Sequence, residues 1–402
     1  MKNTKHNNRR EFLKKVGLLS TPFLVPASVF AASNPTVGAG KEKKKSNEIP
    51  VNFIWEGLYL PPDKYIEKLV EINEENPIEF DYYGKGGPTE MLEKEFAKVT
   101  GKEKAIYFPS GTMANQVAMK ILNEDNTKVV VPENSHIFRD ESDAAQSVHE
   151  LRLIPLGKDK PYFDLQELKS AIDYSNTEFY YDSGLGTIVI ENPVRRVQNR
   201  YVPFETIKEI SKFCRENGYK LHLDGARLHI ASAYSGISVA EYASQFDTVY
   251  ISLYKYLNAG GGAMLCGDTV VIDKMAHQIK ILGGSILRNW SNTAMALHYL
   301  PGIDERWQQV ILKGHQLITE LNKINGLQIS SLENGTNSYK MELDPEIDSK
   351  VISEYLSEKN MIWAARIMDT GGYVFAVNES LLFVDNSEVV QAWKTAIKQA
   401  AN

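Results

Sequence analysis

The chain has few cysteines, no excess of basic residues and, past its N-terminus, no long apolar run. Its 402 residues include only Cys214 and Cys266, too few for a disulfide scaffold, and we expect two buried free thiols. Its 45 basic against 51 acidic side chains give a net charge of −6, which argues against a nucleic-acid partner. A 43% hydrophobic content over this length permits a large core, and we expect two domains.

The first 32 residues have the pattern of an export signal. Asn8-Arg-Arg-Glu-Phe-Leu-Lys14 is a twin-arginine pattern, and the apolar stretch from Val16 to Ala32 follows it. We therefore predict a signal peptide over residues 1–32, export to the periplasm and no stable membrane span after processing. A general secretory signal and an uncleaved anchor are the alternatives. Residues 33–50 are rich in Lys, Ser, Asn and Gly and predict a flexible linker.

Strand-like and helical segments alternate along the middle of the chain. The strand-like runs are Ala105–Pro109, Lys128–Pro132, Leu151–Leu156, Thr187–Glu191, Tyr219–Asp224, Thr248–Leu253 and Gly262–Cys266, and helical patterns include Thr112–Leu122, Leu165–Ile172 and Phe204–Asn217. This alternation predicts an α/β fold with a mostly parallel sheet. After about Asp304, a long helical pattern leads into short strands and a last helix. We therefore expect a large domain over residues 51–303 and a smaller α+β domain over residues 304–402.

Two of the expected strands end in residues that together suit one cofactor. The run Leu221-His-Leu-Asp-Gly-Ala-Arg227 places Asp224 at a strand end, and Lys255 follows the next strand, 31 positions later (255 − 224). Ligand sites of open α/β sheets lie beyond the carboxyl ends of the strands. A lysine and a carboxylate there suit pyridoxal 5′-phosphate (PLP), because the lysine forms the Schiff base and the Asp keeps the pyridine nitrogen protonated. Taken singly, an Asp is more often a helix cap and a Lys a surface charge.

A candidate phosphate site upstream supports the assignment of Asp224 and Lys255 to a PLP site. Ser110-Gly-Thr112 lies between an expected strand and an expected helix, where small residues let a phosphate reach the helix N-terminus. The alternative is that Ser110 or Thr112 only caps the helix. Ser252, three positions before Lys255, is a further candidate for the phosphate, and a satisfied strand hydroxyl is its alternative. We predict no metal site.

The order of these motifs resembles the threonine aldolase and β-eliminating lyase family. The resemblance runs from about Asn52 to about Ser380 and rests on Ser110-Gly-Thr-x-Ala-Asn115, His136, Glu191-Asn192, Asp224-Gly-Ala-Arg227 and Lys255. It implies the PLP-dependent transferase-like fold (fold type I, the aspartate-aminotransferase-like fold) for the large domain.

The resemblance also implies roles for other residues. His136 would stack on the cofactor ring, and its imidazole is a candidate base. Arg227 would lie beside the cofactor as one of its binding residues and would bind the substrate carboxylate through its guanidinium. Lys280 and Arg288 resemble a pair that reaches the phosphate of a neighbouring subunit. This pair would make the active form at least a dimer, and we expect a homodimer or homotetramer.

Several positions depart from the pattern of the family. Ile54-Trp-Glu-Gly57 stands where the family has Ser-Asp-Thr, and Phe375 stands near the place of a carboxylate-binding Arg. Glu191-Asn-Pro-Val194 lacks the second His of the family. We expect Trp55 and Phe375 to shape a more apolar substrate pocket. We also expect Phe375→Arg to raise activity toward simple β-hydroxy amino acids.

The function that these observations favour is cleavage of a small-molecule amino acid. The resemblance implies a PLP-dependent carbon–carbon lyase that cleaves the Cα–Cβ bond of β-hydroxy amino acids to glycine and an aldehyde, with Lys255, His136 and Asp224 as catalytic residues. Other PLP reactions on amino acids remain open, namely β-elimination, racemisation and transamination. A catalytically silent, exported binding protein is a third hypothesis, against which the intact Asp224 and Lys255 argue.

Overall fold

A computed structural model describes residues 49–178, 183–367 and 372–401. The predicted signal peptide and all but the last two residues of the predicted linker lie outside these ranges. No helix within them is long and apolar enough to cross a membrane.

The central element is a sheet in the order β2-β8-β7-β6-β5-β3-β4. Its strands are β2 (Lys104–Phe108), β3 (Lys128–Pro132), β4 (Arg152–Leu156), β5 (Leu185–Glu191), β6 (Lys220–Asp224), β7 (Thr248–Ser252) and β8 (Ala263–Gly267). Strands β7, β6, β5, β3 and β4 pair in parallel, whereas β8 is antiparallel to both of its neighbours. The predicted α/β fold with a mostly parallel sheet is confirmed.

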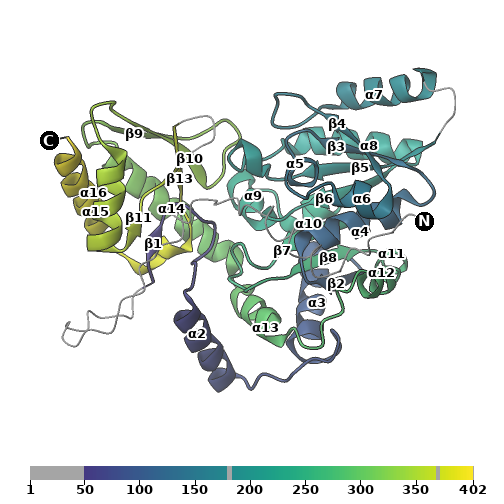
Figure 1. The fold of residues 1–402 in the computed structure, drawn as a ribbon, viewed down its shortest axis with the longest axis horizontal. Coiled ribbons are helices and arrows are strands. Elements are labelled where there is room, and N and C mark those ends of the chain that lie inside the picture. The colour runs from purple at the N-terminus through teal and green to yellow at the C-terminus, as the bar shows by residue number, and fades with distance from the viewer. Residues whose placement is uncertain (1–48, 179–182, 368–371, 402) are drawn as a thin grey trace, which may run out of the picture. The chain divides into compact units, whose positions relative to one another are not determined.

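Helices cover the sheet on both sides, as Figure 1 shows. Strands β3 and β7 are buried along their whole length, which explains why they read as continuous β-branched and apolar runs. Helix α4 packs across β5, β6, β7 and β8, and α8 packs on β6. The helices of this part are α3 (Gly87–Thr100), α4 (Gly111–Asn123), α5 (His136–Arg139), α6 (Ala144–His149), α7 (Leu165–Glu178), α8 (Phe204–Asn217), α9 (Leu228–Ser235), α10 (Val239–Ala243), α11 (Thr269–Ile272), α12 (Met275–Ile281) and α13 (Trp290–Tyr299), with a 3₁₀ turn η2 (Arg195–Val197).

The C-terminal region is built on an antiparallel sheet in the order β12-β13-β10-β9. Its strands are β9 (Leu327–Ser330), β10 (Ser338–Leu343), β12 (Arg366–Ile367) and β13 (Tyr373–Ala376), and its helices are α14 (Ile303–Leu321), α15 (Ser349–Asn360) and α16 (Asn386–Ala400), with a 3₁₀ turn η3 (Glu379–Phe383). This combination agrees with the α+β character expected of the region.

The start of the described chain joins this C-terminal region. Strand β1 (Val51–Asn52) pairs in parallel with β11 (Ile362–Trp363), and the backbone N–H of Asn52 donates to Ser380 Oγ at 3.0 Å. The chain then runs past the end of β7 and enters α2 (Pro62–Glu75). Residues 51–58 therefore run from a two-stranded sheet in the C-terminal region to the backbone of Lys255.

Phe375 lies in the core of the C-terminal region and not at a cavity. Its ring is fully buried, stacks on Phe53 with 4.1 Å between ring centroids, and meets Trp393 of α16 at 6.2 Å. We expected Phe375 to shape the substrate pocket. The structure instead gives it two aromatic partners, and Phe375 is not among the residues that line the cavity beside Lys255.

This placement reverses the expected effect of Phe375→Arg. The substitution would bury an unpaired guanidinium between two aromatic rings, so we expect a loss of more than about 3 kcal/mol of stability instead of a gain in activity. Thermal and denaturant unfolding of the purified protein measure this loss. The control is Phe383→Arg, because Phe383 is 62% exposed. Equal unfolding midpoints for the two variants would contradict this assignment of Phe375 to the core.

Candidate active site

Acidic residues end two neighbouring strands at the carboxyl edge of the central sheet. Glu191 at the end of β5 stands in register with Asp224 at the end of β6, and Asp224 stands in register with Tyr250 on β7. Lys255 follows β7 by three residues and lies close enough to Asp224 to interact with its charge. The structure thus brings together the Asp and the Lys that the sequence predicted.

Asp224 is a buried carboxylate held by neutral donors. Its Oδ2 accepts from Asn115 Nδ2 at 3.0 Å, and its Oδ1 accepts from the backbone N–H of Ala226 at 3.2 Å. Burial raises the pKa of Asp224, and the nearby Glu141 raises it further, whereas His136 lowers it. A protonated pyridine nitrogen would supply the compensating charge that this carboxylate needs. The donor set around Asp224 therefore fits PLP.

Asn115, from α4, links the acids of the site. Its Nδ2 donates to Glu141 Oε1 at 2.9 Å as well as to Asp224, and its Oδ1 lies 3.0 Å from His222 Nε2. Burial lowers the pKa of His222 to about 3, so this imidazole is neutral. Because Asn115 Oδ1 can only accept, the proton of His222 resides on Nε2. His222 therefore orients the amide of Asn115 so that its N–H groups face the two carboxylates.

His136 is held by two further acids. Its Nδ1 lies 3.0 Å from Glu141 Oε1, and its backbone N–H donates to Glu191 Oε2 at 2.6 Å. Burial alone would lower the pKa of His136, but the hydrogen bond to Glu141 and the charge of Asp224 outweigh it and raise the pKa. Burial and the charge of Asp224 raise the pKa of Glu191 to about 7. The sequence did not single out Glu141 or assign a role to Glu191.

Lys255 has the properties of an amine nucleophile. Burial, followed by the charge of Arg227, lowers its pKa to about 8, so the uncharged amine is far more populated near neutral pH than in an ordinary lysine. It lines a cavity of 340 Å³ together with Trp55, Glu56 and Tyr254. Trp55 is 46% exposed and stacks on Tyr59 at 6.0 Å, and its role in binding a substrate stays a prediction.

The candidate phosphate site has three components of different quality. Ser110 is exposed, and its Oγ accepts from the backbone N–H of Met113 at 3.3 Å, so it caps α4 as its alternative role required. A Cβ at Gly111 would overlap the hydroxyl of Tyr250, so only glycine fits there, next to the half-buried Thr112. Ser252 Oγ is buried and forms no hydrogen bond of good geometry within the described residues, although the Tyr250 hydroxyl is near enough to interact. A phosphate oxygen would satisfy that hydroxyl.

Arg227 already has a carboxylate partner inside the chain. Its Nε donates to Glu56 Oε1 at 2.7 Å, and both side chains are largely buried, with 5% and 13% exposure. Burial alone would raise the pKa of Glu56, but Arg227 and Lys255 together lower it to about 2. Glu56 lies in the segment Ile54-Trp-Glu-Gly57, which stands where the family has Ser-Asp-Thr, and the sequence alone predicted no role for it.

Lys280 and Arg288 lie outside this cluster. Both are exposed, with Lys280 Nζ at 5.2 Å from the ring centroid of Tyr83 and Arg288 Cζ at 4.1 Å from that of Phe80. Neither lines the cavity beside Lys255. Their predicted contact with a neighbouring subunit stays a prediction.

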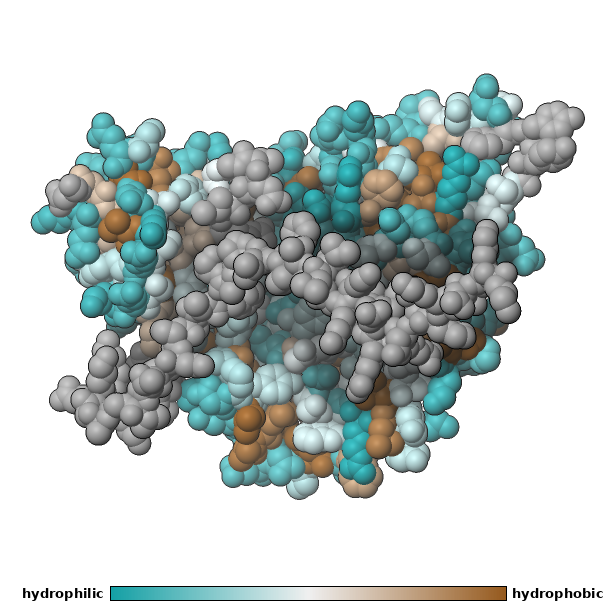
Figure 2. All heavy atoms as spheres, viewed as in Figure 1, coloured by the Kyte–Doolittle hydropathy of each residue, from teal (hydrophilic) through white to brown (hydrophobic). Residues whose placement is uncertain are grey.

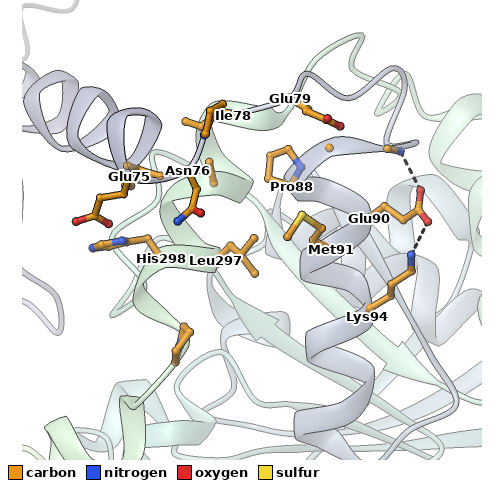
Figure 3. A pocket seen from close by; sticks show the side chains of 16 residues that line it. Glu75, Asn76, Ile78, Glu79, Pro88, Glu90, Met91, Lys94, Leu297 and His298 are labelled. Atoms are coloured by element: carbon orange, nitrogen blue, oxygen red, sulfur yellow. Dashed lines mark hydrogen bonds and ion pairs between the residues drawn. The ribbon is translucent and has the colours of Figure 1, made fainter.

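A larger cavity of 780 Å³ lies elsewhere, between α2, α3 and α13 (Figure 3). Leu297 and His298 of α13 face Glu75 and Asn76 at the end of α2, and Met91 of α3 lines the same space. None of the predicted cofactor residues lines it. None of its described lining residues has a buried polar side-chain atom without a hydrogen-bond partner. Lys255 and Glu56 line the smaller cavity instead.

Comparison with known sequences connects this arrangement to one family. Residues 68–342 match the family model described as beta-eliminating lyase. A low-specificity L-threonine aldolase of Candida albicans is 33% identical over 54% of this chain and 58% of its own length, so the match spans little more than half of that relative. The low-specificity L-threonine aldolase of Saccharomyces cerevisiae is 28% identical over 68% of this chain and 70% of its own length.

Solved structures agree with the fold. A protein from Exiguobacterium sp., described as an aromatic amino acid beta-eliminating lyase/threonine aldolase, is 25% identical and superimposes with a TM-score of 0.73 over 88% of this chain and 98% of its own. A protein from Listeria monocytogenes, described as an L-allo-threonine aldolase, gives a TM-score of 0.73 at 22% identity over 88% of this chain and 97% of its own. The likeness to the second protein shows the fold alone.

Proposed function

The chain belongs to the beta-eliminating lyase family, and we propose that it is a PLP-dependent lyase that cleaves the Cα–Cβ bond of β-hydroxy amino acids to glycine and an aldehyde. The observation that carries the proposal is Lys255, whose pKa is lowered to about 8 in a cavity beside the buried Asp224. A silent binding protein of this family has no need of that lysine.

The residues that would hold the cofactor are those gathered at the carboxyl edge of the sheet. Lys255 would be the attachment residue, Asp224 would accept from the ring nitrogen, and the N-terminus of α4 with Ser252 would receive the phosphate. When bound, PLP supplies an electron sink for the carbanion that remains at Cα after the bond breaks.

His136 is the candidate group for the β-hydroxyl proton, directly or through a water molecule. Glu141 holds its Nδ1, which fixes the ring orientation. A base must be uncharged to accept a proton, and the raised pKa of His136 means that the uncharged form gains population only above its ordinary range. If His136 is the base, activity should therefore rise with pH, and this rise should lie above the pH at which an ordinary histidine titrates.

The proposed reaction is tested by product analysis. Purified, PLP-loaded protein should release glycine and the matching aldehyde from L-threonine, L-allo-threonine or phenylserine, the last being favoured by the exposed ring of Trp55. Lys255→Ala should lower this release on the order of 10³-fold or more. Lys274→Ala, an exposed lysine, serves as the control and should keep full activity. Ammonia plus a keto acid, or an epimerised amino acid, in place of glycine would instead establish one of the other PLP reactions.

We also propose that the active form is a homodimer or homotetramer. Phe80, Tyr82, Tyr83, Ile286 and Leu287 expose large apolar surfaces, and the backbone N–H of Tyr83 donates to the carbonyl of Leu287 at 3.0 Å. Figure 2 shows hydrophobic residues at the surface in the lower part of the view, where α2, α3 and α13 lie in Figure 1. Such a surface beside Lys280 and Arg288 suits a subunit interface.

Light scattering tests this assembly. The wild type should have at least the mass of a dimer, and Leu287→Glu should shift the protein toward the monomer and weaken PLP binding, because a charge would enter an apolar contact. Leu312→Glu on α14 is the matched control, since Leu312 is 63% exposed. A wild-type monomer with full activity would refute the proposal.

Export through the twin-arginine route is our proposal for the N-terminal segment. This route carries folded proteins, as a cofactor-loaded enzyme needs. Cell fractionation should find a shortened chain in the periplasm, and the double substitution Arg9→Lys with Arg10→Lys should retain the protein in the cytosol. Intact, uncleaved wild-type chain in the cytosol would speak against export.

A further inference from the structure

A network of hydrogen bonds runs through the buried side of the site and ends at His136. Thr248 on β7 bonds to His222 on β6, with Oγ1 and Nδ1 2.8 Å apart. His222 Nε2 lies 3.0 Å from Oδ1 of Asn115 on α4. Asn115 Nδ2 donates to Glu141 Oε1 at 2.9 Å, and the same oxygen lies 3.0 Å from His136 Nδ1. The network thus joins two strands of the central sheet and α4 to the segment that carries His136.

The carboxylate of Glu141 fixes the direction of every bond in this network. The side chain of Glu141 is buried, with 2% exposure, and a carboxylate accepts hydrogen bonds but cannot donate them. Both Asn115 Nδ2 and His136 Nδ1 must therefore donate to it. Asn115 Oδ1 then faces His222, whose neutral ring carries its proton on Nε2. The remaining nitrogen of His222 accepts the hydroxyl proton of Thr248.

These directions leave one nitrogen of His136 able to take up a proton. With its own proton on Nδ1, the neutral imidazole carries a lone pair on Nε2. Nε2 forms no hydrogen bond within the residues that the structure describes, and the side chain of His136 is 35% exposed. The other tautomer would set the lone pair of Nδ1 against the carboxylate of Glu141 and lose their hydrogen bond. Glu141 therefore decides which nitrogen of His136 is the base.

Asn115 holds Glu141 from outside the segment that carries His136. The amide of Asn115 also donates to Asp224 at 3.0 Å, so turning it by half a rotation would set its oxygen against two carboxylates. His222 opposes the same rotation, because its Nε2–H needs the oxygen as an acceptor. Asn115, His222 and Thr248 are all fully buried. A buried polar network whose members are all satisfied specifies one arrangement of its groups.

We propose that Glu141 is a positioning residue that makes Nε2 of His136 the base for the β-hydroxyl proton, and that Asn115 keeps Glu141 in the position to do so. The inference rests on the proposed function, because it concerns the proton that leaves the substrate in that reaction. The O–H electron pair becomes part of the aldehyde carbonyl, and the Cα–Cβ pair passes to the electron sink that PLP supplies when bound. A proton returned to Cα completes glycine.

Other acids also act on His136, and a test must leave them in place. Asp224 faces it from β6, Glu191 faces it from β5, and Asp140 lies on its own segment. Glu141→Gln changes none of these groups. Glutamine keeps an oxygen that can accept from His136 Nδ1 and removes the charge, so the substitution separates the carboxylate of Glu141 from its shape.

The experiment follows His136 in two ways in the full-length, PLP-loaded protein. Nitrogen NMR of 15N-histidine-labelled protein gives the tautomer and the titration midpoint of His136, whose signal is assigned by its loss in His136→Gln. The pH dependence of kcat/KM for glycine release from L-threonine gives the midpoint at which the base acts. In the wild type the neutral ring should carry its proton on Nδ1, and the two midpoints should agree.

Glu141→Gln should lower both midpoints by the same amount, because the carboxylate no longer stabilises the charged imidazole. It should also lower kcat by about tenfold or more, since an amide holds Nδ1 less firmly than a carboxylate does. Glu150→Gln is the matched control, because it removes an exposed acid at the end of α6, and it should leave both midpoints and kcat unchanged.

The far end of the network allows a second test that leaves every charge unchanged. Thr248→Val removes the hydroxyl that holds the ring of His222 and keeps the shape of the side chain. It should lower kcat by about threefold or more, and Thr248→Ser should restore it. Thr187→Val on β5 is the matched control, because Thr187 Oγ1 is buried without a hydrogen-bond partner in the described structure. This control should keep the wild-type kcat.

The outcomes separate this inference from the function on which it rests. A wild type that releases no glycine from any β-hydroxy amino acid would overturn the proposed function. Glycine release with its proton on Nε2 of the neutral His136, or with an unchanged kcat/KM midpoint in Glu141→Gln, would overturn the inference alone. If Glu141→Gln fails to fold, the Thr248 variants decide, and equal kcat values in Thr248→Val and Thr248→Ser would contradict the inference.

Discussion

The site depends on keeping several carboxylates buried at one edge of the sheet. Asp224, Glu191 and Glu141 come from different elements, and no guanidinium or ammonium group forms a hydrogen bond with any of them in the described structure. The amide of Asn115, the imidazole of His136 and backbone N–H groups take that place. Neutral donors stabilise a carboxylate without cancelling its charge, so the edge of the sheet retains a negative potential that a cationic ring nitrogen can meet.

The charge of the buried Arg227 is balanced within the chain itself. Arg227 follows Asp224 by three residues, so the end of β6 supplies both the buried carboxylate and the guanidinium that pairs with Glu56. Its partner Glu56 comes from residues 51–58, which are anchored on the C-terminal region through Asn52 and Asn378. Lys255 thus interacts with the charge of Asp224 and with the charges of the Arg227–Glu56 ion pair, and burial with the charge of Arg227 lowers its pKa.

The sequence predicted the parts of the site that depend on local pattern. Buried apolar runs located the strands of the central sheet, and the rule for strand ends located Asp224 and Lys255. It missed Glu141 and the role of Asn115, because their significance lies in contacts between α4, α5 and β6 that no local pattern records. It misplaced Phe375, since an apolar residue near a family arginine suggests a pocket wall, whereas the inward face of β13 and the ring of Phe53 decide where it packs.

The short path between the first described strand and the active site has a consequence for handling this protein. Only four residues, 52–55, separate Val51 of β1 from Glu56, and Gly57 packs against the backbone of Lys255. An affinity tag or fusion partner joined directly before Val51 would interfere with the pairing of β1 and β11. Because Glu56 follows so soon after β1, the disturbance would also reach the ion pair of Glu56 with Arg227. Expression vectors for this protein therefore need their spacer at the N-terminus, where the chain itself carries residues 33–50.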